Sequence, residues 1–285
     1  SDYEQNLKKV SAADLQAVAK KYFSPQKFFL MALFPEGATP EGFADKIQKQ
    51  AAARKTVGTS LSEYQLASGA SLLFEAKPGA SLESYTLAIH AGGKHTSMPG
   101  ISDALMRMMT RESKRYGSKA LQDYLDQEGF SLSAWSDRDA SYINLQAPKG
   151  SSEGALALMM ELVTKPVFNA DTWEGVQKEL IAGLQGVQDQ PSAVANYLLH
   201  ETLFGGTPYG ESVDETIEAL SAATVADVKA FYKQAIKAQA MAVVYHGPSS
   251  VAALKEGLSP LKRLKGKAKL AAEDQSADWS QDVVR

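Results

Sequence analysis

Apolar and polar positions follow one helix-then-strand pattern at two places in the chain. Over residues 11–22, a polar cap and an acidic first turn precede an i, i+3, i+4, i+7 apolar stripe, which predicts a helix. The continuous apolar run at 28–34 predicts a buried strand, and a proline then closes the unit. The same order of cap, stripe, strand and proline returns over residues 224–248.

The two units keep a constant separation along the sequence. Asp14 and Asp227 stand 227 − 14 = 213 residues apart, and Pro35 and Pro248 are also 248 − 35 = 213 residues apart. Two unrelated helix–strand units are the alternative, but the matched caps and closing prolines favour a duplicated domain. We therefore expect the first unit to close one domain and the second unit to close the next.

The chain between the two units predicts one layered domain. A hairpin and a third strand come first, two paired strands and several helices follow, and the second unit adds the last strand. The predicted strands are 63–66, 71–75, 84–91, 131–136, 140–147 and 241–245, and the predicted helices are 100–109, 118–128, 152–163, 172–188, 193–203 and the one capped by Thr224. This order predicts the α+β class, with an antiparallel-rich β-sheet covered by helices on one face.

These patterns divide the chain into four parts. Residues 1–35 are expected to be the C-terminal tail of a preceding homologous domain, and residues 36–60 a linker rich in Ala, Gln and Lys. Residues 61–258 are expected to form a complete domain, and 259–285 a charged linker to a further domain. The chain begins inside a helical pattern and ends without a polar tail, so we expect a fragment of a larger protein.

Composition narrows the classes of function. Hydrophobic residues make up 44% of the 285 residues, which is enough for a sizeable core. Lys plus Arg number 30 and Asp plus Glu 33, and this net charge of −3 argues against nucleic acid as the main partner. The chain has no cysteine, which excludes disulfides, thiolate zinc ligands and a cysteine nucleophile. We expect no membrane span and no signal peptide, and a bacterial periplasm or envelope and a cytoplasm are both compatible with these features.

The serial order of several short motifs resembles the M16 family of zinc metallopeptidases, which includes insulinase, pitrilysin and the mitochondrial processing peptidase. The resemblance covers about residues 61–248, and its most specific motif is the Phe-Gly-x-x-Pro-Tyr-Gly turn at 204–210. It implies an M16/LuxS-like fold and a parent of two halves, each of two related domains, that close around a peptide chamber. The other motifs are, in order, Ala91-Gly92-Gly93, Pro99-Gly100 before a helix, Gly129 before Ser131–Ala134, and Lys165–Phe168.

The catalytic motif of the family is degenerate in this sequence. In catalytic members of the family, the helix after the Pro-Gly pair carries the motif His-x-x-Glu-His. Its two His are zinc ligands, and its Glu is the general base. Asp103 and Arg107 stand at the two His positions, and Met106 stands at the Glu position. An Asp–Arg pair at i, i+4 favours an ion pair, and a methionine has no base to offer. The third ligand of the family, a Glu on a later helix, falls on Val176 or Glu179, depending on the register.

The resemblance therefore implies a non-catalytic M16-like domain from the C-terminal half of its parent. It implies no catalytic residue and no metal in this fragment, whereas the catalytic half of the parent binds Zn. It also implies a wall of the peptide-degrading chamber that assists substrate binding, with peptide, other M16 domains or a catalytic subunit as partners. The Arg and Tyr that the family contributes from its last domain fall after residue 285. The alternative is a structural scaffold without peptidase activity, like the core subunits of the respiratory cytochrome complex.

Four histidines and a basic cluster are the remaining candidates for chemistry. His90 and His95 lie five residues apart across two glycines and could approach each other, so a metal enzyme that uses them is a third, weaker hypothesis. We expect His200 and His246 to be structural. The cluster is expected to be a solvated helix end, with a contact to an anionic substrate or partner domain as the alternative. It comprises Arg111, Lys114, Arg115 and Lys119.

Overall fold

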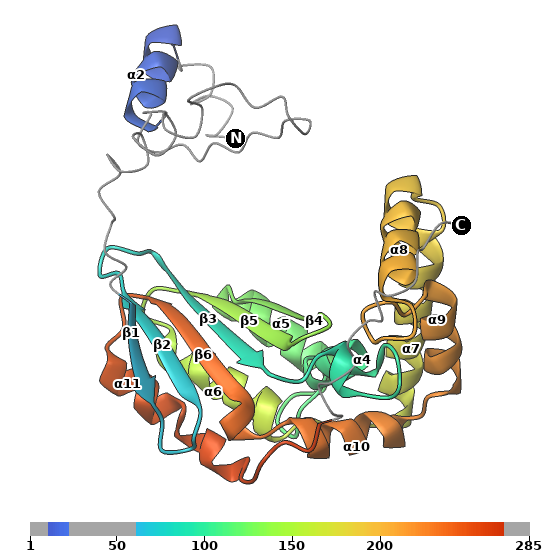
Figure 1. The fold of residues 1–285 in the computed structure, drawn as a ribbon. Coiled ribbons are helices and arrows are strands. Elements are labelled where there is room, and N and C mark those ends of the chain that lie inside the picture. The colour runs from blue at the N-terminus through green and yellow to red at the C-terminus, as the bar shows by residue number, and fades with distance from the viewer. Residues whose placement is uncertain (1–10, 23–60, 271–285) are drawn as a thin grey trace, which may run out of the picture. The chain divides into compact units, whose positions relative to one another are not determined.

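The computed structural model in Figure 1 describes residues 11–22 and 61–270. The chain divides into two compact units, Ser1–Thr59 and Ser60–Arg285. The described part of the first unit is helix α2 (Ala12–Tyr22), which begins after Ser11. The N–H and the hydroxyl of Ser11 both donate to Asp14 Oδ2, at 2.8 and 2.6 Å. The predicted strand at 28–34 and the predicted linker at 36–60 lie outside the described residues.

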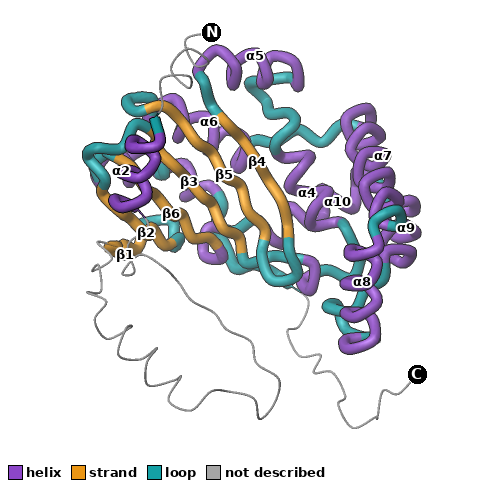
Figure 2. Tube along the Cα trace, turned by 90° about the horizontal axis from the view of Figure 1, so that it is seen from above, coloured by secondary structure: helices purple, strands orange, loops and turns teal. Residues whose placement is uncertain are grey.

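The second unit is built on one six-stranded mixed sheet (Figure 2). Its strands are β1 (Leu61–Gln65), β2 (Ser71–Ala76), β3 (Leu82–Ile89), β4 (Ser131–Ser136), β5 (Ser141–Pro148) and β6 (Met241–Gly247). Their order across the sheet is β1-β2-β6-β3-β5-β4, and all neighbours are antiparallel except the parallel pair β2 and β6. The last strand in sequence therefore lies at the centre of the sheet.

Helices cover one face of this sheet, which confirms the predicted α+β class (Figure 1). The opposite face, onto which Figure 2 looks, is not covered by any described helix of this unit. The helices are α4 (Ile101–Met109), α5 (Ser118–Glu128), α6 (Ser152–Thr164), α7 (Ala170–Val187), α8 (Pro191–Phe204), α9 (Val213–Ala222), α10 (Val225–Ala235) and α11 (Val251–Gly257), with short 3-10 turns η2 (Gly93–His95), η3 (Ala238–Ala240) and η4 (Ser259–Arg263). None of the described helices is both long enough and apolar enough to cross a membrane.

The core lies between the sheet and these helices. Strand β3 alternates strictly, so Tyr85, Leu87 and Ile89 are fully buried on the helix side. The methionines at 106, 108 and 109 fill the space under α4 and are also buried, as their spacing predicts. This one continuous core accounts for the stability of the unit as a domain.

The packed domain extends past its predicted end at residue 258. Leu261 lies in η4 and is fully buried, and Leu264 is 9% exposed. The N–H of Ala238 donates to the carbonyl of Leu264 at 3.0 Å, which ties this segment to the turn before β6. Residues 259–264, which the sequence assigned to a linker, therefore contribute two leucines to the core.

A fully buried carboxylate links several of these elements. Glu83 Oε2 accepts hydrogen bonds from the hydroxyls of Tyr85 at 2.6 Å, Ser249 at 2.8 Å and Tyr245 at 2.9 Å. Its Oε1 accepts from the N–H of Gly150 at 3.1 Å. Burial acts to raise the pKa of Glu83, but these four donors outweigh it and hold the pKa below its usual value.

Candidate functional site

Helix α4 carries the three positions at which the resemblance places a degenerate catalytic motif. It starts at Gly100, whose φ of +79° favours glycine, and a Cβ there would lie 2.9 Å from the side chain of Leu220 on α9. The 3.6-residue period then places Asp103 and Arg107 on one partly exposed face of α4. Met106 points the other way and is 1% exposed. The position at which the resemblance places the general base is therefore part of the hydrophobic core.

A cluster of ion pairs occupies the exposed face of the motif. Arg107 Nε lies 3.2 Å from Asp103 Oδ2, and Arg107 Nη1 lies 2.5 Å from Glu179 Oε1 on α7. The other oxygen of Glu179 is paired with Arg111, one turn further along α4. Two guanidinium groups thus face two carboxylates, and both oxygens of Glu179 are engaged.

The two positions that the sequence left open for the third ligand have different surroundings. Val176 is 2% exposed and packs in the core, whereas Glu179 reaches α4 and contacts Arg107. The residues at the motif do not fit a zinc ion, because the permanently charged Arg107 lies between the carboxylates that would have to bind it. In the described ranges 11–22 and 61–270, no group of three or more His, Cys, Asp or Glu side chains could hold a metal ion.

The two histidines near the start of α4 do approach each other. The ring centroids of His90 and His95 lie 4.7 Å apart at an interplanar angle of 71°. His95 is buried, and its Nδ1 accepts a hydrogen bond from the N–H of Gly92 at 3.0 Å, which assigns the proton to Nε2. This contact orders the loop before α4, so His95 has a structural function independent of any metal.

The other two histidines lie far from the motif in the sequence and contact their own neighbours. His200 lies on α8, with its ring 5.7 Å from that of Phe204. His246 is at the end of β6, and its Nδ1 lies 2.8 Å from Glu75 Oε2 on β2. Both contacts are within or between adjacent elements and agree with the expected structural functions.

Three members of the basic cluster have separate partners. Arg111 pairs with Glu179, and Lys119 Nζ lies 2.9 Å from Asp123 one turn along α5. The guanidinium of Arg115 lies 5.2 Å from the centre of the Tyr116 ring. These contacts support the interpretation of a solvated helix end rather than a convergent anion site.

A polar network that the sequence did not predict holds the Phe-Gly-x-x-Pro-Tyr-Gly turn. Asp139, in the loop between β4 and β5, accepts from the hydroxyl of Tyr209 at 2.5 Å and from Lys94 Nζ at 2.8 Å. Arg138 pairs with Glu211 at the end of the same turn. Lys94 and Tyr209 hold the pKa of Asp139 below its usual value, whereas burial raises the pKa of Glu211 despite its arginine partner.

The network joins three segments that are far apart in sequence, since Lys94 follows β3, Asp139 lies between β4 and β5, and Tyr209 follows α8. Their residues lie between periodic elements, so no hydrophobic pattern marks them. The turn was recognisable as a sequence motif. The close approach of its two ends explains why its last residue, Gly210, is a glycine. A Cβ on Gly210 would lie 2.3 Å from the carbonyl oxygen of Phe204, so only glycine fits.

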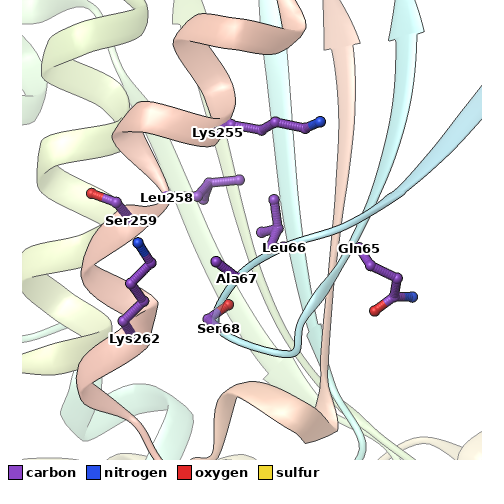
Figure 3. Close-up of a pocket in the computed structure, with 8 residues that line it drawn as sticks. All are labelled: Gln65, Leu66, Ala67, Ser68, Lys255, Leu258, Ser259 and Lys262. Carbon is purple, nitrogen blue, oxygen red and sulfur yellow. The ribbon is translucent and has the colours of Figure 1, made fainter.

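A pocket of about 270 Å³ lies near the other edge of the sheet, between the β1–β2 turn and the α11–η4 segment (Figure 3). Figure 3 shows that the ammonium groups of Lys255 and Lys262 point in different directions. Lys255 Nζ lies 4.3 Å from the centre of the Tyr64 ring. Because its charged groups do not converge, the pocket lacks the arrangement expected of a binding or catalytic site. Its lining residues are Gln65, Leu66, Ala67, Ser68, Lys255, Leu258, Ser259 and Lys262.

Comparisons with known proteins find a family model and curated relatives that match this chain. The model of the insulinase family, peptidase family M16, matches residues 72–217, just over half of the 285-residue chain. Among curated proteins, the chain is 22% identical over 163 residues to the non-peptidase homolog YmxG of Helicobacter pylori. It is 25% identical over 121 residues to subunit 1 of the mitochondrial cytochrome b-c1 complex of Caenorhabditis elegans. The first match covers 56% of this chain and 38% of the relative, and the second covers 42% and 26%.

Solved structures show the same fold. A peptidase M16 inactive domain from Pseudomonas fluorescens superposes with a TM-score of 0.69 at 23% identity, over 76% of this chain and 54% of that chain. The periplasmic protease PqqL from Escherichia coli superposes with a TM-score of 0.68 at 16% identity, over 77% of this chain and 26% of that chain. The chain therefore spans from about a quarter to about half the length of the proteins that it matches.

Proposed function

Because the chain belongs to the insulinase family, peptidase family M16, we propose that its second unit is a non-catalytic M16 domain that forms part of the wall of a peptide-degrading chamber. The observation that carries this proposal is the ion-pair cluster on α4 and α7. Arg107 lies between Asp103 and Glu179, where a catalytic member of the family would bind its metal. A chain with this cluster needs a zinc-bearing half elsewhere in its parent if peptides are to be cut.

Two features beside the cluster support contact with a peptide. Helix α4 packs on β4 and β5, and among the described strands β4 is an edge strand that pairs only with β5. The free edge of β4 offers backbone donors and acceptors to an extended chain. On the uncovered face, Trp135 is 44% exposed and stacks on Tyr142 with centroids 5.2 Å apart. A partly exposed aromatic pair at a free sheet edge is suited to unfolded peptide segments.

The proposal is tested first by activity. The purified chain, loaded with equimolar zinc, should cleave no unstructured fluorogenic peptide, because Met106 supplies no base and Arg107 excludes the ion. Cleavage that a chelator abolishes and that purifies with the chain would contradict the proposal. A mock purification from cells that do not express the chain controls for contaminating peptidases.

Binding gives the second test. A fluorescent unstructured peptide should bind weakly to the chain, and Trp135→Ala should reduce the affinity several-fold. The matched control is Leu61→Ala, which removes another exposed apolar side chain at the opposite edge of the sheet. Equal affinities for the chain and for Trp135→Ala would show that the β4 edge contributes nothing to peptide binding.

A scaffold without any peptidase activity is the second candidate, and the names of the two curated relatives favour it. One relative is described as a non-peptidase homolog and the other as a subunit of a respiratory complex. The two candidates differ in the rest of the parent. A His-x-x-Glu-His motif in another domain or in a partner subunit supports the chamber wall, and a parent whose domains all lack the motif supports the scaffold.

A further inference from the structure

The charges of the second unit are divided unevenly along the chain. Residues 61–227 hold 11 Lys or Arg and 22 Asp or Glu, a net charge of 11 − 22 = −11. Residues 228–270 hold nine Lys or Arg and a single acidic residue, Glu256, a net charge of 9 − 1 = +8. A chain whose overall charge is only −3 therefore contains a strongly basic segment. An asymmetry of this kind points to a partner with the opposite charge.

The cations of the basic segment are not neutralised within the unit. Of the 11 Lys and Arg in residues 61–227, eight lie in ion pairs with carboxylates. None of the nine in residues 228–270 forms an ion pair with a carboxylate that the structure describes. Ion pairs inside the domain therefore do not account for the excess of positive charge.

The fold brings seven of these cations to the region where α10 ends. The N–H of Ala238, just after the helix, donates to the carbonyl of Leu264 at 3.0 Å. The N–H of Lys269 donates to the carbonyl of Gln234, within the helix, at 3.1 Å, so residues 264–269 run beside the end of α10. The side chains of this α10 basic patch are exposed, apart from the partly exposed Lys237. The patch consists of Lys233, Lys237, Lys262, Arg263, Lys265, Lys267 and Lys269.

The surroundings of the patch decide which kind of anionic partner it fits. The exposed large apolar side chains of the described residues all lie elsewhere, so the patch lacks the apolar anchors on which protein partners depend. The neighbouring rings of Phe231 and Tyr232 pack on the core and offer no platform for nucleic-acid bases. Lys262 lines the pocket of Figure 3, but Lys255 turns to the ring of Tyr64, so no pair of cations converges on a small anion. A surface with many separate anionic groups fits cations that are spread out in this way.

We propose that the α10 basic patch binds the domain to the surface of a bilayer that contains anionic phospholipids. Lysines and arginines near such a surface are attracted by the lipid phosphates without entering the hydrocarbon region. Because residues 61–227 carry a net charge of −11, the same surface repels the rest of the unit and favours an approach with the patch first. Residues 271–285, with four acidic residues and one arginine, lower the net charge of residues 228–285 only to +5.

Co-sedimentation of the 285-residue chain with vesicles tests the proposal. The chain should bind vesicles of phosphatidylcholine that contain about 30% phosphatidylglycerol, and it should not bind vesicles of phosphatidylcholine alone. Raising the NaCl concentration from about 0.1 M to about 0.5 M should weaken binding at least 10-fold, because salt screens exposed charges. Lys265→Gln/Lys267→Gln/Lys269→Gln should weaken binding by about 100-fold, since each cation near the surface contributes about 5-fold.

Two further variants separate charge from other effects of the substitutions. The matched control, Lys114→Gln/Lys149→Gln/Lys178→Gln, removes three exposed lysines outside the patch and should bind as the unaltered chain does. Replacing the three patch lysines by arginine keeps the charge and should also preserve binding. All variants should keep the urea midpoint of the unaltered chain, because the replaced side chains are exposed.

Four results would overturn the proposal. They are no binding to the anionic vesicles, equal binding to both kinds of vesicle, equal losses in the glutamine variant and its control, and displacement from vesicles by millimolar glycerophosphate, which would indicate a site for free phosphate. Tighter binding to single-stranded RNA than to vesicles, lost in the same glutamine variant, would assign the patch to nucleic acid instead. Peptide binding and peptidase activity do not enter these measurements, so failure of the proposed function would leave them unchanged.

Discussion

Among the individual residues, Arg107 is a permanent cation that lies between the carboxylates of Asp103 and Glu179. Arg107 neutralises Asp103 on its own helix. Arg107 and Arg111 both pair with Glu179, and these contacts connect α4 to α7. The ion pairs therefore link the two helices through side chains alone. Because these side chains are one-third to one-half exposed, each pair contributes only about 0.2–1 kcal/mol.

The first prediction restores a ligand set at this place. In Asp103→His/Arg107→His, two imidazoles one helical turn apart would face the carboxylate of Glu179, which is the His₂Glu set that binds zinc. We expect this variant to bind one zinc ion per chain, measured by competition with a chromophoric chelator. Adding Glu179→Gln should weaken binding by about 10-fold or more. Zinc binding no stronger than that of the unaltered chain would contradict the assignment of Glu179.

The second prediction concerns the pH dependence that Glu83 imposes on stability. Its pKa is lower in the folded chain than its usual value, so its contribution is fully present above the pKa of the unfolded chain and disappears as pH falls through the folded value. Glu83→Gln should therefore lower the free energy of unfolding by about 2 kcal/mol or more at pH 7. Urea unfolding below about pH 4 should show a smaller difference. A difference that stays constant with pH would show that Glu83 is not ionised in the folded chain.

At the scale of elements, the turn at 204–210 shows how glycine and a polar network fix a loop. The turn closes on itself at Gly210 and is tied to the β4–β5 loop through Tyr209 and Asp139. Gly210→Ala should cost about 2 kcal/mol or more of stability, because the backbone of Phe204 would have to move. Urea unfolding of Gly117→Ala is the control, since a Cβ at Gly117 meets nothing within 4 Å. Equal losses in the two variants would remove the steric argument.

Elements with strong periodicity were predictable from the sequence. Helix α5 and strand β4 have their predicted bounds, and Gly129 ends α5 in the left-handed conformation that a C-terminal glycine suggests. Helix α9 was not predicted, although Ser212 and Glu215 form a capping box whose residue types and spacing were visible. Its short stripe buries only Leu220, so its hydrophobic signal is weak.

Strand order and the polar contacts could not be predicted from local pattern. The position of β6 between β2 and β3 depends on pairing across more than 150 residues, which no local period encodes. The choice between Val176 and Glu179 depends on which face of α7 is buried against the core. Likewise, Asp139 meets Tyr209 only because two loops converge after the sheet and helices have packed.

At the scale of the whole molecule, the second unit is a compact unit with its own core. Its sheet is covered on one face, its core is continuous from β2 to η4, and Arg107 of α4 is paired with Glu179 of α7. The described helix of the first unit has an exposed apolar position instead. The buried core residues that the structure describes all lie in the second unit.

The last prediction follows from that contrast. Deleting residues 1–59 should leave the unfolding temperature of residues 60–285 unchanged within about 2 °C, because all the buried core residues that the structure describes lie in the second unit. Calorimetry of the shortened and full chains, each with the same tag, gives the comparison. A lower unfolding temperature after the deletion would contradict this prediction.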